Sequence, residues 1–199
     1  MGNLRNNSVG GNEAKETAGA VTPSQSRVVR LLGRAISGDC EAFGELYSIY
    51  LDRIYRYVFY QVRDKMTAED ITEEVFIKAW KALASCKGKE RTFSSWLYRI
   101  ARNQLIDSLR KRHGELPLQP EMTNGLIDRS QTEKALEQQE QLEALTYLPR
   151  NQRQVVILKF IEGFDNREIS RIMSKSEGAI RVLQTRALAT LRQRLGAEG

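Results

Sequence analysis

The feature that most constrains the fold is a stretch near the C-terminus, residues 164–195, which has the pattern of two helices joined by a tight turn. Asp165 followed by Glu168 is a helix start signal, because the aspartate oxygen caps a free backbone N–H and the glutamate stabilises the positive end of the helix dipole. Ser174-Lys175-Ser176 supplies the turn, and Ser176 is suited to cap the second helix. The pattern predicts a helix-turn-helix, whose second helix can enter a DNA major groove.

The second helix of this pair is predicted to be amphipathic. Apolar residues recur at three- and four-residue steps and predict one buried face, made of Ile180, Leu183, Ala187, Leu191 and Leu195. The residues largely off this face that could reach base edges are Arg181, Gln184, Thr185 and Arg186. The alternative, an ordinary pair of bundle helices with a solvated basic face, stays open on this evidence alone.

Composition and charge bound the class of protein. Among 199 residues, 28% are charged and 41% hydrophobic, which is typical of a globular protein with one large or two small domains. The net charge of +6 favours a polyanionic partner. Basic residues predominate over 165–195, whereas 66–75 carries only acidic charge, so we expect the two surfaces to serve different partners.

Several classes of protein are disfavoured by what the sequence lacks. Cys40 and Cys86 form no CxxC or Cys/His pattern, and the single histidine is His113, so neither a metal site nor a disulfide framework is expected. No Gly-rich phosphate loop, GxSxG or HExxH motif is present, so we expect no catalytic residues and no cofactor. Without a signal peptide or an apolar run long enough to cross a bilayer, a cytoplasmic protein with no membrane insertion of its own is expected.

The chain is predicted to be all-α, with two small helical domains joined by a flexible linker. Polar residues 1–26 are expected to be a disordered tail, 27–112 the first domain, 113–131 the linker and 132–199 the second domain. The helices of the first domain are expected at 27–37, 41–62, 67–84 and 94–112. The third is predicted to start with a Thr67–Asp70 capping box, and in the second domain a helix is expected between Pro149 and Gly163.

The helix expected at 94–112 and the loop before it combine basic and aromatic residues. The basic and polar positions are Lys87, Lys89 and Arg91 in the loop and Arg99, Arg102, Asn103 and Arg110 on one face of the helix. Phe93, Trp96 and Tyr98 are interleaved with them. Cations that neutralise phosphates beside rings that stack on bases are suited to hold unpaired DNA. The alternatives are that the arginines are merely solvated and that Phe93 and Trp96 pack in the core, which we favour for Trp96.

The helix expected at 67–84 presents the carboxylates of Glu69, Asp70, Glu73 and Glu74. Acidic residues in a first turn stabilise the helix dipole, so a purely structural role is one reading. Four carboxylates also repel a phosphate backbone, which favours a protein partner. A metal is the weaker alternative, because this open surface offers no histidine and no closed cage.

Taken together, these blocks resemble the sigma-70 family of bacterial RNA polymerase sigma factors, and most closely its small extracytoplasmic-function (ECF) group. The resemblance covers 27–112 and 132–195, as sigma region 2 and region 4. Ala68–Trp80, AEDITEEVFIKAW, looks like the segment that binds the clamp helices of the polymerase β′ subunit. The matching positions are Asp70, Glu73, Glu74 and Lys78, with Glu73 standing where the family commonly has Gln.

The resemblance also implies the DNA contacts. It places Lys87, Lys89 and Arg91 in the loop that captures a flipped base of the −10 element, with Arg99, Arg102, Asn103 and Arg110 on the helix that follows. It implies −35 recognition by Arg181, Val182, Gln184, Thr185 and Arg186. The sequence departs from the family here, because Val182 and Leu183 stand where Ser and Arg are usual and Gln184 replaces an apolar residue.

The function implied is that of a non-enzymatic sigma factor. Its partners would be core RNA polymerase, through the β′ clamp helices and the β subunit, promoter DNA, and an anti-sigma factor that covers the same surfaces. One alternative is a stand-alone helix-turn-helix regulator with an N-terminal sensor domain, which requires a pocket with convergent polar groups. Another is a helical adaptor that binds no nucleic acid, which predicts no salt-dependent affinity for DNA.

Overall fold

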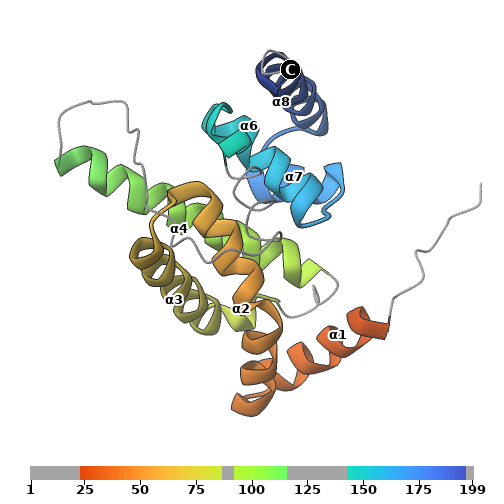
Figure 1. Ribbon diagram of the computed structural model, residues 1–199. Helices are drawn as coiled ribbons and strands as arrows, with labels where there is room; N and C mark the ends of the chain where they lie inside the picture. Colours follow the sequence, from red (N-terminus) through yellow and green to blue (C-terminus); the bar gives the residue numbers. More distant parts are fainter. Residues whose placement is uncertain (1–22, 87–91, 116–142, 196–199) are drawn as a thin grey trace, which may run out of the picture.

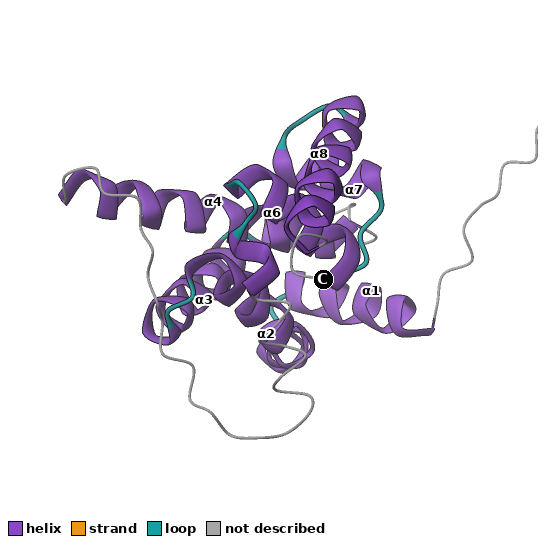
Figure 2. Ribbon diagram, turned by 45° about the horizontal axis from the view of Figure 1, so that its top comes forward, coloured by secondary structure: helices purple, strands orange, loops and turns teal. Residues whose placement is uncertain are grey.

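The computed structural model describes residues 23–86, 92–115 and 143–195, and Figure 1 shows how their helices are arranged. The N-terminal unit consists of α1 (Pro23–Ile36), α2 (Cys40–Val62), α3 (Lys65–Lys81), the 3₁₀ turn η1 (Leu83–Cys86) and α4 (Phe93–Glu115). The C-terminal unit contains α6 (Arg150–Val156), the π-helical turn η3 (Ile157–Ile161), α7 (Asn166–Met173) and α8 (Glu177–Leu195). Figure 2 shows no strand within these ranges, and the predicted all-α fold is confirmed.

The N-terminal unit is built around α2, which packs against α1, α3 and α4. Asp39 begins α2 by accepting a hydrogen bond from the backbone N–H of Ala42 at 3.0 Å. Arg63, with a φ of 57°, ends it in the left-handed conformation. Apolar side chains from these helices are removed almost entirely from water and form the core, among them Leu32, Leu46, Ile54, Leu97 and Leu105.

Some helix boundaries differ from the sequence-based expectation. α1 begins at Pro23 rather than Arg27, since proline is well suited to a first helical turn, where its missing N–H is not needed. α3 begins at Lys65 rather than Thr67, because the cap is Asp64, whose Oδ2 accepts from the Thr67 backbone N–H at 2.8 Å. The Thr67–Asp70 capping box was therefore wrong, and Thr67 is a buried residue of the first turn.

Other expectations fall partly or wholly outside the described residues. α4 continues to Glu115, so the first residues assigned to the linker are helical, and 116–131 are not described. Residues 1–22 are not described either. Of the helix expected to start near Thr132, only the end at 143–146 is described. None of the helices in the described ranges is long and apolar enough to cross a membrane.

The helix-turn-helix pattern is confirmed in the C-terminal unit. Asp165 and Glu168 form the expected capping box, with Asp165 Oδ1 accepting from the Glu168 N–H at 2.7 Å. Ser174 turns the chain with a φ of 53°, and the Ser176 hydroxyl oxygen accepts from the N–H of Ala179 at 3.2 Å. Of the predicted apolar face of α8, Ile180 and Ala187 are fully buried, Leu183 and Leu191 are partly buried, and the side chain of Leu195 is not described.

The helix predicted between Pro149 and Gly163 has an unexpected end. α6 starts directly after Pro149, then widens into η3, where the N–H of Glu162 bonds to the carbonyl of Ile157 at 3.0 Å. Gly163 follows with a φ of +79°, which stops the helix as expected for glycine. A π turn holds one residue more than an α turn, and this sets the direction of Glu162.

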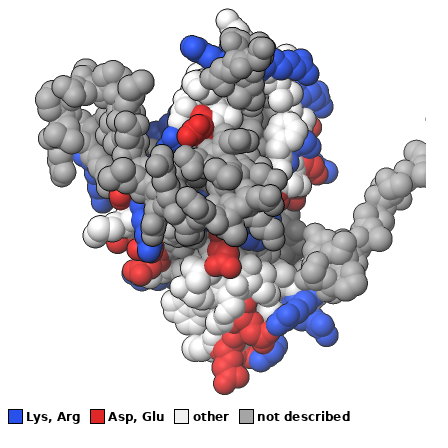
Figure 3. All heavy atoms as spheres, viewed as in Figure 1, with Lys and Arg blue, Asp and Glu red and all other residues white. Residues whose placement is uncertain are grey.

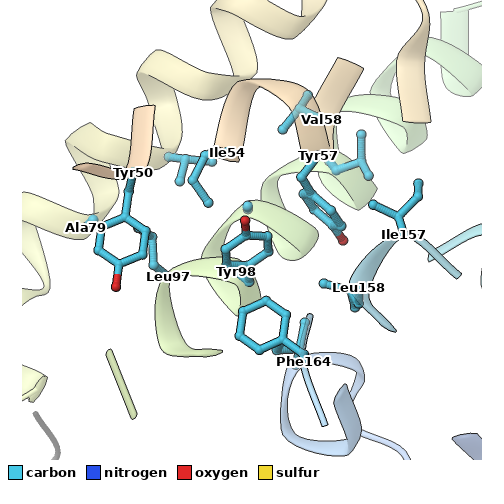
Figure 4. Packing of buried hydrophobic residues seen from close by; sticks show 14 of the residues in the cluster. Tyr50, Ile54, Tyr57, Val58, Ala79, Leu97, Tyr98, Ile157, Leu158 and Phe164 are labelled. Atoms are coloured by element: carbon cyan, nitrogen blue, oxygen red, sulfur yellow. The ribbon is translucent and has the colours of Figure 1, made fainter. Parts of the chain in front are cut away.

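The two units contact each other along α4, against which α7 packs, and along α2, which meets α6 and η3. Figure 4 shows the ring of Tyr98, from α4, between Tyr57 of α2 and Phe164 of the C-terminal unit. The centroid of the Tyr98 ring lies 5.3 Å from that of the Tyr57 ring and 4.8 Å from that of the Phe164 ring, and both pairs are in edge-to-face contact. Aromatic packing therefore continues from one unit into the other.

Candidate nucleic-acid and protein-docking surfaces

The second helix of the helix-turn-helix, α8, exposes most of the residues predicted to read the −35 element. Arg181, Val182, Thr185 and Arg186 are exposed, with 49% of Val182 accessible. Gln184 differs, because its Nε2 donates to Asn166 Oδ1 at 2.8 Å and thereby ties α8 to α7. Its amide is engaged within the motif, where it holds the angle between the two helices.

The basic face of α4 is divided by the contact with the C-terminal unit. Arg99, Asn103 and Arg110 are exposed, as expected from the sequence. Arg102 is half-buried instead, with its Nε donating to Gln154 Oε1 of α6 at 3.3 Å. The four residues therefore do not share one free face, since Arg102 is turned toward the other unit. The loop residues Lys87, Lys89 and Arg91 lie outside the described residues.

A cavity of about 440 Å³ opens at the N-terminal end of α4. Its lining residues come from η1, α4 and α7: Ser85, Cys86, Thr92, Ser95, Trp96, Arg99 and Arg171. Trp96 is half-buried and packs on Phe93 at a centroid distance of 5.6 Å, so it contributes to the core and also presents a ring edge to the cavity. Its packing against the core agrees with the reading favoured from the sequence, and a role in holding unpaired DNA stays a prediction.

The acidic surface lies on α3, at the left of Figure 3, while Lys and Arg gather over α8 at the top. Asp70 and Glu73 are exposed on this helix. Glu74 and Lys78 are also exposed, but both bind the buried Gln104 of α4. Gln104 donates from Nε2 to Glu74 Oε2 at 2.8 Å and accepts from the Lys78 ammonium. These two predicted docking residues therefore also join α3 to α4.

Two exposed apolar residues on the same helix were missed by the sequence analysis. Ile77 is 52% and Trp80 41% accessible, and their spacing from Asp70 and Glu73 puts all four on one face of α3. Tyr47 of α2 is a further exposed apolar residue beside α3, with its ring packed on Phe76 of that helix. Ile77 and Trp80 could have been found from the sequence, because helical spacing places them outside the buried stripe of α3. A surface of this kind, apolar and flanked by carboxylates, is suited to bind a protein.

Glu162 is a second functional candidate that the sequence did not reveal. Its side chain is completely buried between the two units. Oε2 accepts from Arg53 Nε at 3.2 Å and from the Tyr98 hydroxyl, and Oε1 accepts from Arg56 Nη2 at 3.2 Å. The second nitrogen of Arg53, Nη2, donates to the backbone carbonyl of Glu162 at 3.1 Å. One carboxylate thus joins the C-terminal unit to two helices of the N-terminal unit.

Burial at the contact between the two units shifts the pKa of a tyrosine and of an arginine. Burial and the adjacent Glu162 carboxylate raise the pKa of Tyr98, which keeps its hydroxyl a donor at all ordinary pH values. Burial lowers the pKa of Arg153, and the neighbouring charges of Arg63 and Arg150 lower it further. Arg153 therefore lies where burial and neighbouring positive charge both disfavour its protonated form.

Potential metal-ligating side chains do not cluster in the described part of the chain. No group of three or more His, Cys, Asp or Glu side chains is placed to hold a metal ion there. Cys86 is buried and Cys40 is exposed, and neither forms a disulfide. The surfaces that stand out are instead the basic faces of α4 and α8 and the acidic, partly apolar face of α3.

Comparisons with known proteins identify two segments that coincide with these surfaces. The family model for sigma-70 region 2 matches residues 46–115, which include α3 and α4. The model for sigma-70 region 4 matches residues 138–191, which include the helix-turn-helix.

Curated relatives and solved structures agree with these matches. The chain is 36% identical to the ECF RNA polymerase sigma factor BldN of Streptomyces coelicolor, over 86% of this chain and 67% of the relative. It is 33% identical to the ECF RNA polymerase sigma factor SigW of Bacillus subtilis, over 79% of this chain and 91% of the relative. Its fold is similar to CnrH in complex with the cytosolic domain of CnrY, with a TM-score of 0.68 and 24% identity over 87% of this chain and 99% of that one. The sequence matches, together with the surfaces on α3, α4 and α8, show that the chain belongs to the ECF group of the sigma-70 family of RNA polymerase sigma factors.

Proposed function

We propose that the protein binds core RNA polymerase through α3 and directs it to promoters through α4 and α8. Sigma factors are transcription initiation factors, and this assignment gives the chain a non-enzymatic role in the cytoplasm. We propose 23–115 and 132–199 as the two domains, with the first one extended at both ends because α1 begins at Pro23 and α4 ends at Glu115.

The observation that carries this proposal is the separation of two chemically different surfaces on one helical scaffold. Asp70, Glu73, Ile77 and Trp80 form an acidic and apolar face on α3, which repels a phosphate backbone and is suited to bind protein. Exposed cations lie elsewhere, on α4 and α8, where they can neutralise phosphates. A polymerase site and DNA sites can therefore be occupied at the same time.

For the individual residues, the structure favours a revised division of roles. On α3 we propose Asp70, Glu73, Ile77 and Trp80 as the polymerase contacts, with Glu74 and Lys78 fixing α3 against α4 through Gln104. On α4 we propose that Arg99, Asn103 and Arg110 bind the −10 strand, joined by Arg102 when α6 moves away. On α8 we propose that Arg181, Val182, Thr185 and Arg186 contact the −35 element, while Gln184 positions the helix.

We also propose regulation by an anti-sigma factor. A structure of similar fold is that of the sigma factor RpoE in complex with the anti-sigma factor NepR from Bartonella quintana, with a TM-score of 0.60 and 22% identity over 79% of this chain and 98% of that one. The exposed apolar patch of Tyr47, Ile77 and Trp80 offers a surface that a protein inhibitor would have to cover in order to exclude polymerase.

Run-off transcription tests the proposal. Purified core polymerase would be incubated with pooled genomic fragments, with and without this protein, and polymerase capture would be measured by co-purification. We expect discrete transcripts that depend on the protein. A chain that binds DNA but neither captures polymerase nor yields transcripts would instead be a stand-alone regulator.

A further inference from the structure

The side chains that surround Glu162 form an anion-binding site that belongs to one unit alone. Arg53 and Arg56 lie one turn apart on α2, and Tyr98 lies on α4, so all three donors come from the N-terminal unit. The guanidinium carbon of Arg53 lies 6.0 Å from the centre of the Tyr98 ring, which holds these two groups together. Within the described ranges, the acidic partner of both arginines is Glu162, contributed by the other unit.

The donors at this site are suited to a phosphate as much as to a carboxylate. Guanidinium groups present forked N–H donors that match the oxygens of either anion, and a hydroxyl adds a further donor. Arg53 and Arg56 remain 37% and 42% accessible even with Glu162 in place, so a solvent-exposed chain can reach them. If Glu162 leaves, two neighbouring cations lose their counter-ion and repel each other until another anion replaces it.

The site is continuous with the proposed DNA surface of α4. Tyr98, which contacts Glu162, is adjacent to Arg99, and Arg102 lies one turn further along the helix. The C-terminal unit covers this surface at the same places, because Gln154 binds Arg102 and Arg171 lines the cavity beside Arg99. A nucleic-acid strand that contacts Arg102 or the anion site therefore competes with the closed arrangement of the two units.

The closed arrangement also leaves buried polar groups without hydrogen bonds, and this favours separation of the two units. Among the described residues, the Tyr57 hydroxyl and Gln154 Nε2 are buried without a hydrogen-bond partner, and both lie where α2 and α6 meet. A buried polar group without a partner costs the free energy of its desolvation. Separating the units exposes both groups to water and relieves this penalty.

We propose that Glu162 is an internal substitute for a DNA phosphate: in the closed chain it occupies an anion site of Arg53, Arg56 and Tyr98, and in the open chain this site binds the backbone of the promoter strand. The inference rests on the proposed function, since it takes α4 to be a DNA surface. It adds a phosphate site on α2 and a residue that keeps the free chain from binding DNA.

Binding of single-stranded DNA by the full-length chain tests this, using a fluorescein-labelled 20-nucleotide strand of mixed sequence and fluorescence anisotropy. Glu162→Gln removes the competing charge, and we expect it to tighten binding roughly tenfold, as for loss of a charge-assisted hydrogen-bond network. Glu41→Gln is the matched control, because it removes one negative charge from an exposed position in the first turn of α2. We expect it to change the affinity less than about twofold.

Adding Arg53→Gln and Arg56→Gln to the Glu162→Gln chain should abolish the gain. It should also reduce the slope of log affinity against log salt by about 0.7, the value for one phosphate contact on a single strand. Either of two results would overturn the inference: a gain for Glu162→Gln no larger than for Glu41→Gln, or a gain that persists without both arginines.

A second variant covers the case in which Glu162→Gln fails to fold, as judged by circular dichroism. Arg53→Gln with Arg56→Gln alone breaks the same ion pairs but leaves no anion site. It should increase the radius of gyration in small-angle scattering without tightening DNA binding, and an unchanged radius would count against Glu162 as the closing contact. Transcription by core polymerase with the wild-type chain distinguishes a failure of the proposed function from a failure of this inference. Absence of transcription would contradict the proposed function. Normal transcription, together with unchanged DNA affinity in Glu162→Gln, would contradict only this inference.

Discussion

The side-chain amide of Gln184 donates to Oδ1 of Asn166 at 2.8 Å, and this bond joins the two helices of the helix-turn-helix. Gln184 was predicted from the sequence to contact bases, but its side chain instead holds the two helices together. Replacing Gln184 or Asn166 by Ala should therefore have the same effect, a loss of about fivefold in promoter-directed transcription, since one neutral hydrogen bond contributes about 1 kcal/mol.

The double variant tests whether the two residues act as one. We expect it to be no worse than either single variant, because the interaction is already lost. Run-off transcription with core polymerase provides the measurement. Additive losses would indicate that Gln184 contacts DNA independently of Asn166.

Arg186→Ala and Arg181→Ala should each reduce promoter-directed transcription by about tenfold, because a side chain that contacts a base contributes about 1–3 kcal/mol of discrimination. Both arginines are exposed on α8, and Arg181 has only a long 3.7 Å ion pair with Glu177 to lose. Polymerase capture, measured by co-purification, should be unchanged. A loss of capture in these variants would place polymerase on α8.

Asp70→Lys and Trp80→Ala should each weaken capture of core polymerase by at least roughly fivefold. The first reverses a charge at the rim of the proposed surface, and the second removes an aromatic anchor that is 41% accessible. Glu41→Lys makes the same charge reversal on an exposed turn of α2 and serves as the control. Capture that is equally weakened by Glu41→Lys would show a general effect of charge and not a docking site.

Asp165→Ala should destabilise the C-terminal unit by about 1 kcal/mol, the usual contribution of an N-cap. It removes the acceptor for the Glu168 N–H and breaks the capping box at the start of α7. Urea unfolding followed by far-ultraviolet circular dichroism would measure the change. Asp107→Ala, an exposed carboxylate in the middle of α4, should leave the unfolding midpoint nearly unchanged.

Local signals in the sequence were sufficient for much of the fold. The capping box of Asp165 and Glu168, the turn at Ser174 and the stop at Gly163 involve neighbouring residues, so each could be predicted from spacing. The start of α3 was missed because Asp64 and Thr67 both suit an N-cap, and only the turn at Arg63 decides between them.

Contacts between distant parts of the chain were not predictable in this way. Nothing near Glu162 in the sequence shows that it meets Arg53, which is 109 residues away. Arg102 was assigned to an exposed face because the periodicity of one helix does not reveal which unit packs against it. Ile77 and Trp80 were partly predictable. The sequence shows that they lie off the buried stripe of α3, but only the structure shows that both side chains are exposed.

The π turn at η3 lets the chain carry one extra residue without turning Glu162 away from its partners. A π turn is an α turn with one residue inserted, so deleting one residue between Ile157 and Ile161 would restore an ordinary α turn and leave the residues on either side close to their present directions. The same deletion within α6 would instead rotate the helix end that carries Glu162 by about 100°, away from Arg53 and Arg56. The position of a single lost codon would thus decide whether the chain can still close on itself.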